Sequence, residues 1–137
     1  MESNLIALDV GDRRVGIAIA GHTARIARPY GVIDRQVSDV WQVIEKLISE
    51  ENVITIVVGL PRGMEGQETA QTAKIREFAT ELKQRLGVAP RLQDEAVTSQ
   101  MAEDELKARG VSYNKGDIDA LAATYILSDY LSVNAED

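Results

Sequence analysis

Three acidic side chains lie in separated segments of the chain, each where a strand is expected to end or a helix to begin. Asp9 interrupts the apolar run LIALDVG, one of the neighbouring pair Asp94 and Glu95 ends RLQDE on the same face as Asp9, and Asp119 opens the small-residue stretch DALAAT. Burying a carboxylate is costly unless a cation or a hydrogen-bond donor meets it. Carboxylates favour Mg²⁺ or Mn²⁺, and two such ions can activate water and stabilise a leaving oxygen in phosphodiester cleavage. The three acids are therefore a candidate metal site, provided that the fold brings them together.

Each acid also has an ordinary structural interpretation. Asp9 precedes a Val-Gly pair of the kind found in hairpin turns. Asp94 and Glu95 come just before a predicted helix and could serve its first turn, but their side chains must point to opposite faces of a strand. Asp117 is predicted to cap the last helix. Asp119 has small neighbours, which would let that helix lie close to the sheet.

The hydrophobic pattern predicts three strands followed by alternating helices and strands. Strands are expected over about 4–10, 14–20, within 25–33, 53–59 and 89–95, and helices over about 36–50, 68–86, 98–109 and 117–132. Pro29 predicts an edge position for the third strand, because proline donates no ladder hydrogen bond. Thr98 is a candidate cap for the third helix.

This element order predicts a single α/β domain over residues 1–137. An antiparallel meander of three strands, continued by crossover connections, gives a mixed sheet with helices on its faces. The first strand is then central, and its carboxyl end lies beside that of the fourth strand. Open α/β sheets bind their ligands at such an edge. Asp9 is expected there.

Composition sets broad limits on function. The 137 residues include no cysteine, so disulfides and thiolate–metal sites are excluded. The longest apolar run, VITIVVGL, is too short to cross a bilayer, and MESNL does not resemble an export signal. A cytoplasmic protein without membrane association is expected. The net charge of −7 disfavours nonspecific binding to polyanions, but residues 1–35 carry five Arg against four acids.

Four segments, in order along nearly the whole chain, resemble the motifs of the YqgF/RuvX family. They are LDVGDRRVGIA, IVVGLPRGMEG, DEAVTS and KGDIDALAATYIL. The resemblance implies an RNase H-like, Holliday-junction-resolvase-like domain with a five-stranded mixed sheet of order 3-2-1-4-5, in which strand 2 is antiparallel. It also implies a metal-dependent nuclease that matures the 5′ end of the small-subunit ribosomal RNA precursor.

The resemblance assigns the catalytic and metal-binding carboxylates to Asp9, Glu95 and Asp119, holding Mg²⁺ or Mn²⁺, with two ions expected. Phosphate backbone could approach closely at glycines, and nearby cations could hold it. The residues expected to contact nucleic acid are Gly11, Arg13, Arg14, Gly16, Pro61, Arg62 and Lys115. Two positions depart from the family pattern: Ala96 replaces a usual Arg, and Gly63 replaces a frequent Asn.

Three functions remain open at this point. The first is an endonuclease for structured RNA, with a ribosomal precursor particle as a partner. The second is a resolvase for four-way DNA junctions, which needs two active sites and hence a homodimer, whereas RNA cleavage is compatible with a monomer. The third is a noncatalytic adaptor that binds RNA or the ribosome, which the acidic net charge, Ala96 and Gly63 would suit.

Overall fold

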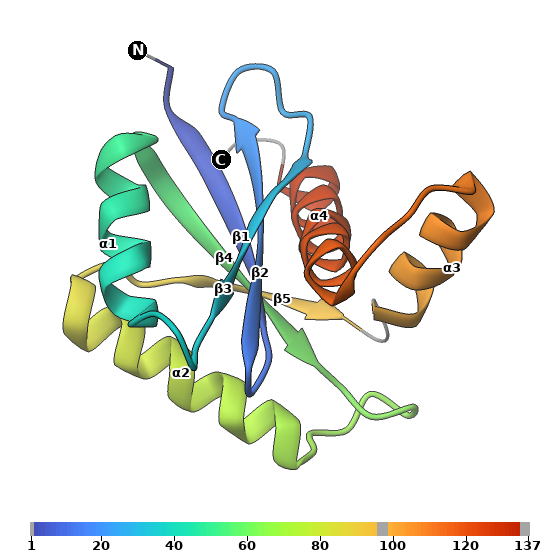
Figure 1. The fold of residues 1–137 in the computed structure, drawn as a ribbon. Helices are drawn as coiled ribbons and strands as arrows, with labels where there is room; N and C mark the ends of the chain where they lie inside the picture. Colours follow the sequence, from blue (N-terminus) through green and yellow to red (C-terminus); the bar gives the residue numbers. More distant parts are fainter. Residues whose placement is uncertain (1, 96–98, 135–137) are drawn as a thin grey trace.

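The computed structural model describes residues 2–95 and 99–134, which form a central sheet with helices on both faces (Figure 1). The strands are β1 (Asn4–Val10), β2 (Arg14–Gly21), β3 (Arg28–Asp34), β4 (Val53–Pro61) and β5 (Arg91–Glu95). The helices are α1 (Val40–Glu50), α2 (Ala70–Leu86), α3 (Ser99–Arg109) and α4 (Lys115–Val133).

The sheet has the order β3-β2-β1-β4-β5, as the sequence predicted. Antiparallel pairing joins β1 to β2 and β2 to β3, whereas β4 runs parallel to both β1 and β5. The proline-containing β3 is an edge strand, which confirms the interpretation of Pro29. The carboxyl ends of β1, β4 and β5 therefore meet at one edge of the sheet.

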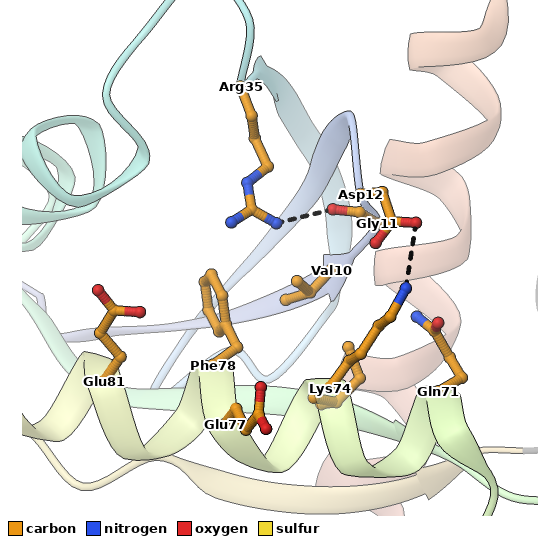
Figure 2. Close-up of a pocket in the computed structure, with 10 residues that line it drawn as sticks. Val10, Gly11, Asp12, Arg35, Gln71, Lys74, Glu77, Phe78 and Glu81 are labelled. Carbon is orange, nitrogen blue, oxygen red and sulfur yellow. Dashed lines mark hydrogen bonds and ion pairs between the residues drawn. The ribbon is translucent and has the colours of Figure 1, made fainter.

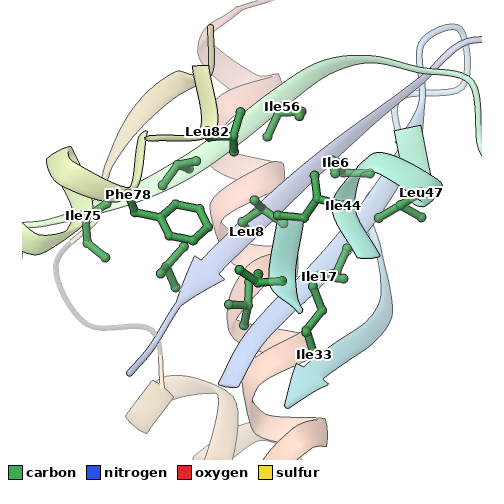
Figure 3. Close-up of a cluster of buried hydrophobic side chains, with 14 of the residues drawn as sticks. Ile6, Leu8, Ile17, Ile33, Ile44, Leu47, Ile56, Ile75, Phe78 and Leu82 are labelled. Atoms are coloured by element: carbon green, nitrogen blue, oxygen red, sulfur yellow. The ribbon is translucent and has the colours of Figure 1, made fainter. Parts of the chain in front are cut away.

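The central strand β1 is covered on both faces, which explains its continuous apolar sequence. Ile6 and Leu8 belong to a core formed with α1 and α2, where Ile44 and Phe78 pack (Figure 3). Leu5 and the alternate residues of β1 face α4 instead. Side chains alternate along a strand, so Asp9 continues the face that α4 covers. The helix α3 packs mainly against the outer side of α4 (Figure 1).

The helices begin a few residues away from the predicted positions, and the cap of α4 is not the residue expected. Helix α1 begins at Val40, since the side chain of Asp39 accepts hydrogen bonds from the first-turn amides. Helix α4 is capped by Asn114, so the prediction that Asp117 is the N-cap was wrong. Asp117 instead completes a capping box, because its carboxylate accepts from the Asn114 backbone amide at 3.0 Å. Thr98 lies outside the described residues.

A buried threonine joins the end of β4 to the start of α2. Thr72 is fully buried, and its hydroxyl donates to the carbonyl of Pro61 at 2.5 Å. It also forms a capping box with Thr69. A buried hydroxyl with partners on both elements fixes the direction in which the chain leaves the sheet edge. The loop between Pro61 and Thr69 is thereby anchored at both of its ends.

Candidate active site

A glycine on β2 brings two of the predicted acids together. Asp9 and Gly16 are directly opposite in the β1–β2 ladder. The backbone of Asp119 lies over Gly16 so closely that a Cβ atom there would be 2.1 Å from the Asp119 carbonyl oxygen. The missing side chain therefore lets α4 rest on the sheet beside Asp9. The prediction that small residues allow this helix a close approach holds, but the decisive small residue is on the strand.

The charge of Asp119 acts on Asp9 and is in turn balanced by an arginine. Burial first, and then repulsion from Asp119, raise the pKa of Asp9 to about 6. Arg14 donates from Nε to Oδ2 of Asp119 at 2.6 Å, and both side chains are largely shielded from solvent. Asp9 thus lies beside an ion pair that joins β2 to α4. Its own negative charge is poorly compensated.

Glu95 is the third acid at this edge of the sheet. It pairs in register with Pro61 at the end of β4, and its partly buried side chain has one oxygen, Oε1, that no described donor reaches. Burial is the largest cause that raises its pKa, followed by a hydrogen bond with Asp129 and the negative charges of Asp129 and Asp9. Asp94 points the other way and binds Arg62, as strand alternation predicted.

Asp129 is a neighbour of the site that the sequence analysis did not identify. It lies about three helical turns beyond Asp119 on α4, at a position whose closeness to Glu95 depends on how the helix crosses the sheet. Two carboxyl groups can hydrogen-bond to each other only if one keeps its proton. Asp129 therefore favours the protonated form of Glu95 unless a cation is present.

The donor chemistry of this edge suits a hard divalent cation. A buried carboxylate oxygen lacks a donor, two carboxyl groups have raised pKa values, and every candidate ligand is an oxygen. As the side chains stand, no group of three carboxylate, imidazole or thiolate residues within 2–95 and 99–134 is gathered closely enough to hold a metal. Asp119 in particular faces Arg14. Its carboxylate would have to turn from Arg14 to join a metal ligand set.

The raised pKa of Asp9 predicts how stability depends on pH without metal. In the folded protein the carboxyl group of Asp9 stays protonated up to about pH 6, whereas in the unfolded chain it loses its proton near pH 3.8. Between these values the folded state binds more protons, so this group makes the free energy of unfolding fall as pH rises, by up to about 3 kcal/mol.

Urea denaturation in EDTA at pH 4, 5, 6 and 7 measures this dependence. Other carboxylates titrate in the same range, so the quantity to compare is the difference between wild type and Asp9→Asn. As pH rises to about 6, the variant should become increasingly more stable than wild type, and above pH 6 the difference in unfolding free energy should stay constant. A difference that is constant with pH would contradict the assignment of a raised pKa to Asp9.

The predicted nucleic-acid contacts on the β1–β2 hairpin differ in their surroundings. Arg13 is exposed and lies 3.4 Å from the carboxylate of Asp34, whereas Arg14 is directed to Asp119. A Cβ atom on Gly11 would be 2.8 Å from the carbonyl oxygen of Arg14, so glycine is needed for the turn itself. The space above Gly16 is filled by α4. The contribution of these residues to nucleic-acid binding stays a prediction.

The remaining predicted contacts lie on both sides of the same edge. Pro61 ends β4 beside Glu95. Arg62 pairs with Asp94 at 3.1 Å and Glu68 at 3.4 Å, so its charge is largely balanced within the protein. Lys115 is exposed at the first turn of α4. Ala96, the position at which the family usually has Arg, lies outside the described residues.

Comparisons with known proteins identify the family of this chain. A family model described as "RuvX: Holliday junction resolvase" matches residues 3–133. Proteins named "Putative pre-16S rRNA nuclease" from Maridesulfovibrio salexigens and Cronobacter sakazakii are 36% and 37% identical to this chain. The alignments cover 93% and 95% of this chain and 97% and 96% of theirs.

A solved structure has the same fold. The RuvC protein of T. thermophilus, in complex with a Holliday junction substrate, superposes with a TM-score of 0.55 at 14% identity, over 98% of this chain and 96% of that one. Within the described residues, no helix is both long and apolar enough to cross a membrane. The family match over nearly the whole chain and the curated relatives together show that this chain belongs to the RuvX family.

Proposed function

We propose that this chain is a divalent-metal-dependent endonuclease that cleaves a phosphodiester bond during 5′-end processing of the 16S ribosomal RNA precursor. The observation that carries the proposal is the poorly compensated acidic edge, where Asp9 and Glu95 have raised pKa values and Asp119 lies beside Asp9. These carboxylates do not stabilise the fold, because burying each of them lowers the free energy of unfolding. A role in binding cations explains why these destabilising carboxylates are present.

Asp9, Glu95 and Asp119 would hold Mg²⁺ or Mn²⁺, with two ions expected from the family resemblance. The metal would supply Lewis-acid activation of the attacking water and stabilise charge on the leaving oxygen. Asp9 is the central ligand in this proposal, because it ends the middle strand of the edge. Glu95 would release its proton when the cation binds, since the positive charge favours the ionised carboxylate and offsets both the burial and the neighbouring negative charges that raise its pKa.

Arg14 has a second role in this proposal. In the metal-free protein its guanidinium neutralises Asp119 at 2.6 Å. If Asp119 served as a metal ligand, the guanidinium of Arg14 would lose this partner and would be available to bind a phosphate group in a bidentate manner. The same arginine would thus stabilise the empty site and position the substrate in the filled one. Lys115 and Arg13, both exposed, would add charge along the backbone.

The RNA substrate is proposed from the names of the relatives, and the experiment compares it with DNA. Purified protein is incubated with Mg²⁺ or Mn²⁺ and either a precursor fragment spanning the mature 5′ end or a four-way DNA junction. We expect a discrete cut in the RNA that EDTA abolishes. If only the DNA junction is cut, the proposed RNA substrate is wrong and the protein is a junction resolvase.

Junction resolution is the second candidate, favoured by the family description and by the fold shared with the RuvC complex. It requires two active sites on one substrate, so the protein would have to be a dimer on the junction. Sedimentation with junction DNA distinguishes the two. If neither substrate is cut and Mn²⁺ does not bind at millimolar concentration, the result would support the third function, a noncatalytic adaptor that binds RNA or the ribosome.

A further inference from the structure

We propose that Arg35 is a positioning residue for the β1–β2 hairpin and, through it, for Asp9 and Arg14. This inference rests on the proposed function, because it assigns Arg35 a part in aligning that site. Arg35 lies just after β3, on the opposite side of the hairpin from α4, at the rim of a cavity of about 220 Å³ (Figure 2). It does not contact the three acids.

Arg35 binds both ends of the hairpin turn. Its Nη1 donates to the carbonyl of Gly11 at 2.9 Å, and its backbone amide donates to the carbonyl of Arg13 at 2.7 Å. The turn itself is closed by the Gly11 amide, which donates to the carbonyl of Arg14 at 2.9 Å. Asp9 precedes this turn in β1, and Arg14 follows it at the start of β2. A displacement of the turn would therefore move both side chains of the site.

The guanidinium of Arg35 is held by an aromatic stack. It lies 5.6 Å from the ring centroid of Phe78 on α2, a ring that is 6% exposed. Phe78 stacks on Trp41 of α1 with the centroids 4.8 Å apart, and Arg85 covers the other side of that stack at 5.4 Å from the Trp41 ring. A cation–π contact of this kind favours the orientation in which the guanidinium also reaches Gly11. Through Arg35, the packing of α1 against α2 thus influences the position of the hairpin.

The other contact across the cavity is weaker. Lys74 on α2 lies 3.6 Å from the carboxylate of Asp12, but both side chains are mostly exposed to solvent (Figure 2). Exposed ion pairs contribute little and fix no direction. The side chain of Arg35 is exposed as well, but its guanidinium donates to a main-chain carbonyl of the turn, that of Gly11, and also contacts the ring of Phe78. A hydrogen bond to the backbone holds the turn more directly than an ion pair between two mobile side chains.

The test compares two arginines on the same aromatic stack. Arg35→Met keeps the length and apolar contact of the side chain but removes the donor to Gly11. Arg85→Met removes the equivalent cation from the Trp41 end, far from the hairpin. Arg35→Lys keeps an amine that can donate to the same carbonyl. Two quantities are measured: hydrogen exchange of the Gly11 and Ile6 amides, and steady-state cleavage kinetics with Mn²⁺.

Arg35→Met is expected to speed exchange at Gly11 about tenfold while exchange at Ile6, in the centre of β1, stays unchanged. The cleavage rate is expected to fall about tenfold with KM within about twofold, because a displaced hairpin misaligns the site without removing a ligand. Arg85→Met should change neither quantity, and Arg35→Lys should recover most of both. Unchanged exchange at Gly11 in Arg35→Met, or equal losses in Arg85→Met, would overturn the role of Arg35. A wild-type protein that does not cleave overturns the proposed function alone, because exchange at Gly11 still decides the role of Arg35.

Discussion

Asp9→Asn is expected to lower the rate of metal-dependent RNA cleavage by on the order of a thousandfold, because it removes the charge of the central ligand in a site that acts through electrostatic stabilisation. Asparagine has nearly the same shape and keeps one oxygen, so the fold should be preserved. The same substitution is expected to stabilise the metal-free protein at neutral pH, since the folded state raises the pKa of Asp9 to about 6. If the variant is more stable than wild type but does not cleave RNA, the loss of activity cannot be caused by unfolding.

The chain offers matched controls for this experiment. Asp12→Asn changes an exposed acid three positions further along the same hairpin, and Asp94→Asn changes the neighbour of Glu95 that points to the other face. Both should cleave at close to the wild-type rate. Mn²⁺ binding, measured by calorimetry, should be weakened by Asp9→Asn and not by either control. Cleavage by Asp9→Asn at the wild-type rate would contradict the metal site proposed at this edge.

Gly16→Ala is expected to have the largest effect on stability, lowering the free energy of unfolding by about 3 kcal/mol. The new methyl group would lie 2.1 Å from the carbonyl oxygen of Asp119 and 3.0 Å from the backbone nitrogen of Ala120. Neither is the end of a flexible side chain, so α4 must move away from the sheet. Because Asp119 moves with it, cleavage should be lost as well.

Gly31→Ala is the matched control for this substitution. Gly31 lies on the neighbouring strand β3, and a Cβ atom there meets nothing within 4 Å. Its stability should stay within about 1 kcal/mol of wild type, because only the intrinsic difference between glycine and alanine remains. Guanidinium denaturation of both variants measures the difference. Equal unfolding free energies for Gly16→Ala and Gly31→Ala would show that α4 does not rest on Gly16 as described.

Much of the fold could be predicted from the sequence because the relevant signals are local. The unbroken apolar run around Leu8 indicates a strand covered on both faces, and the structure places it at the centre of the sheet. Pro29 indicates an edge strand because it lacks an amide donor, and that prediction was confirmed. The prediction that Asp117 caps α4 was wrong, since Asn114 can cap a helix equally well and the backbone dihedral angles decide which residue does.

The candidate site was predictable as a set of residues but not as an arrangement. Asp9, Glu95 and Asp119 could be proposed from their residue type, their places at element ends and the family resemblance. The pairing of Arg14 with Asp119 could not, because it joins residues 105 positions apart. Asp129 gave no separate signal, since its contact with Glu95 depends on the angle at which α4 crosses the sheet.

The sequence by itself determined where most strands and helices lie, and with the family resemblance it indicated the order of the strands and the acids proposed to bind a cation. Hydrophobic periodicity is a property of neighbouring residues, so it can be recognised before the chain folds. Only the tertiary structure decided that Gly16 gives α4 its close approach, that Arg14 balances Asp119, and that Arg35 binds the hairpin from the other face. These contacts depend on packing between elements that lie far apart in the sequence, and packing is fixed only when all of them are in place.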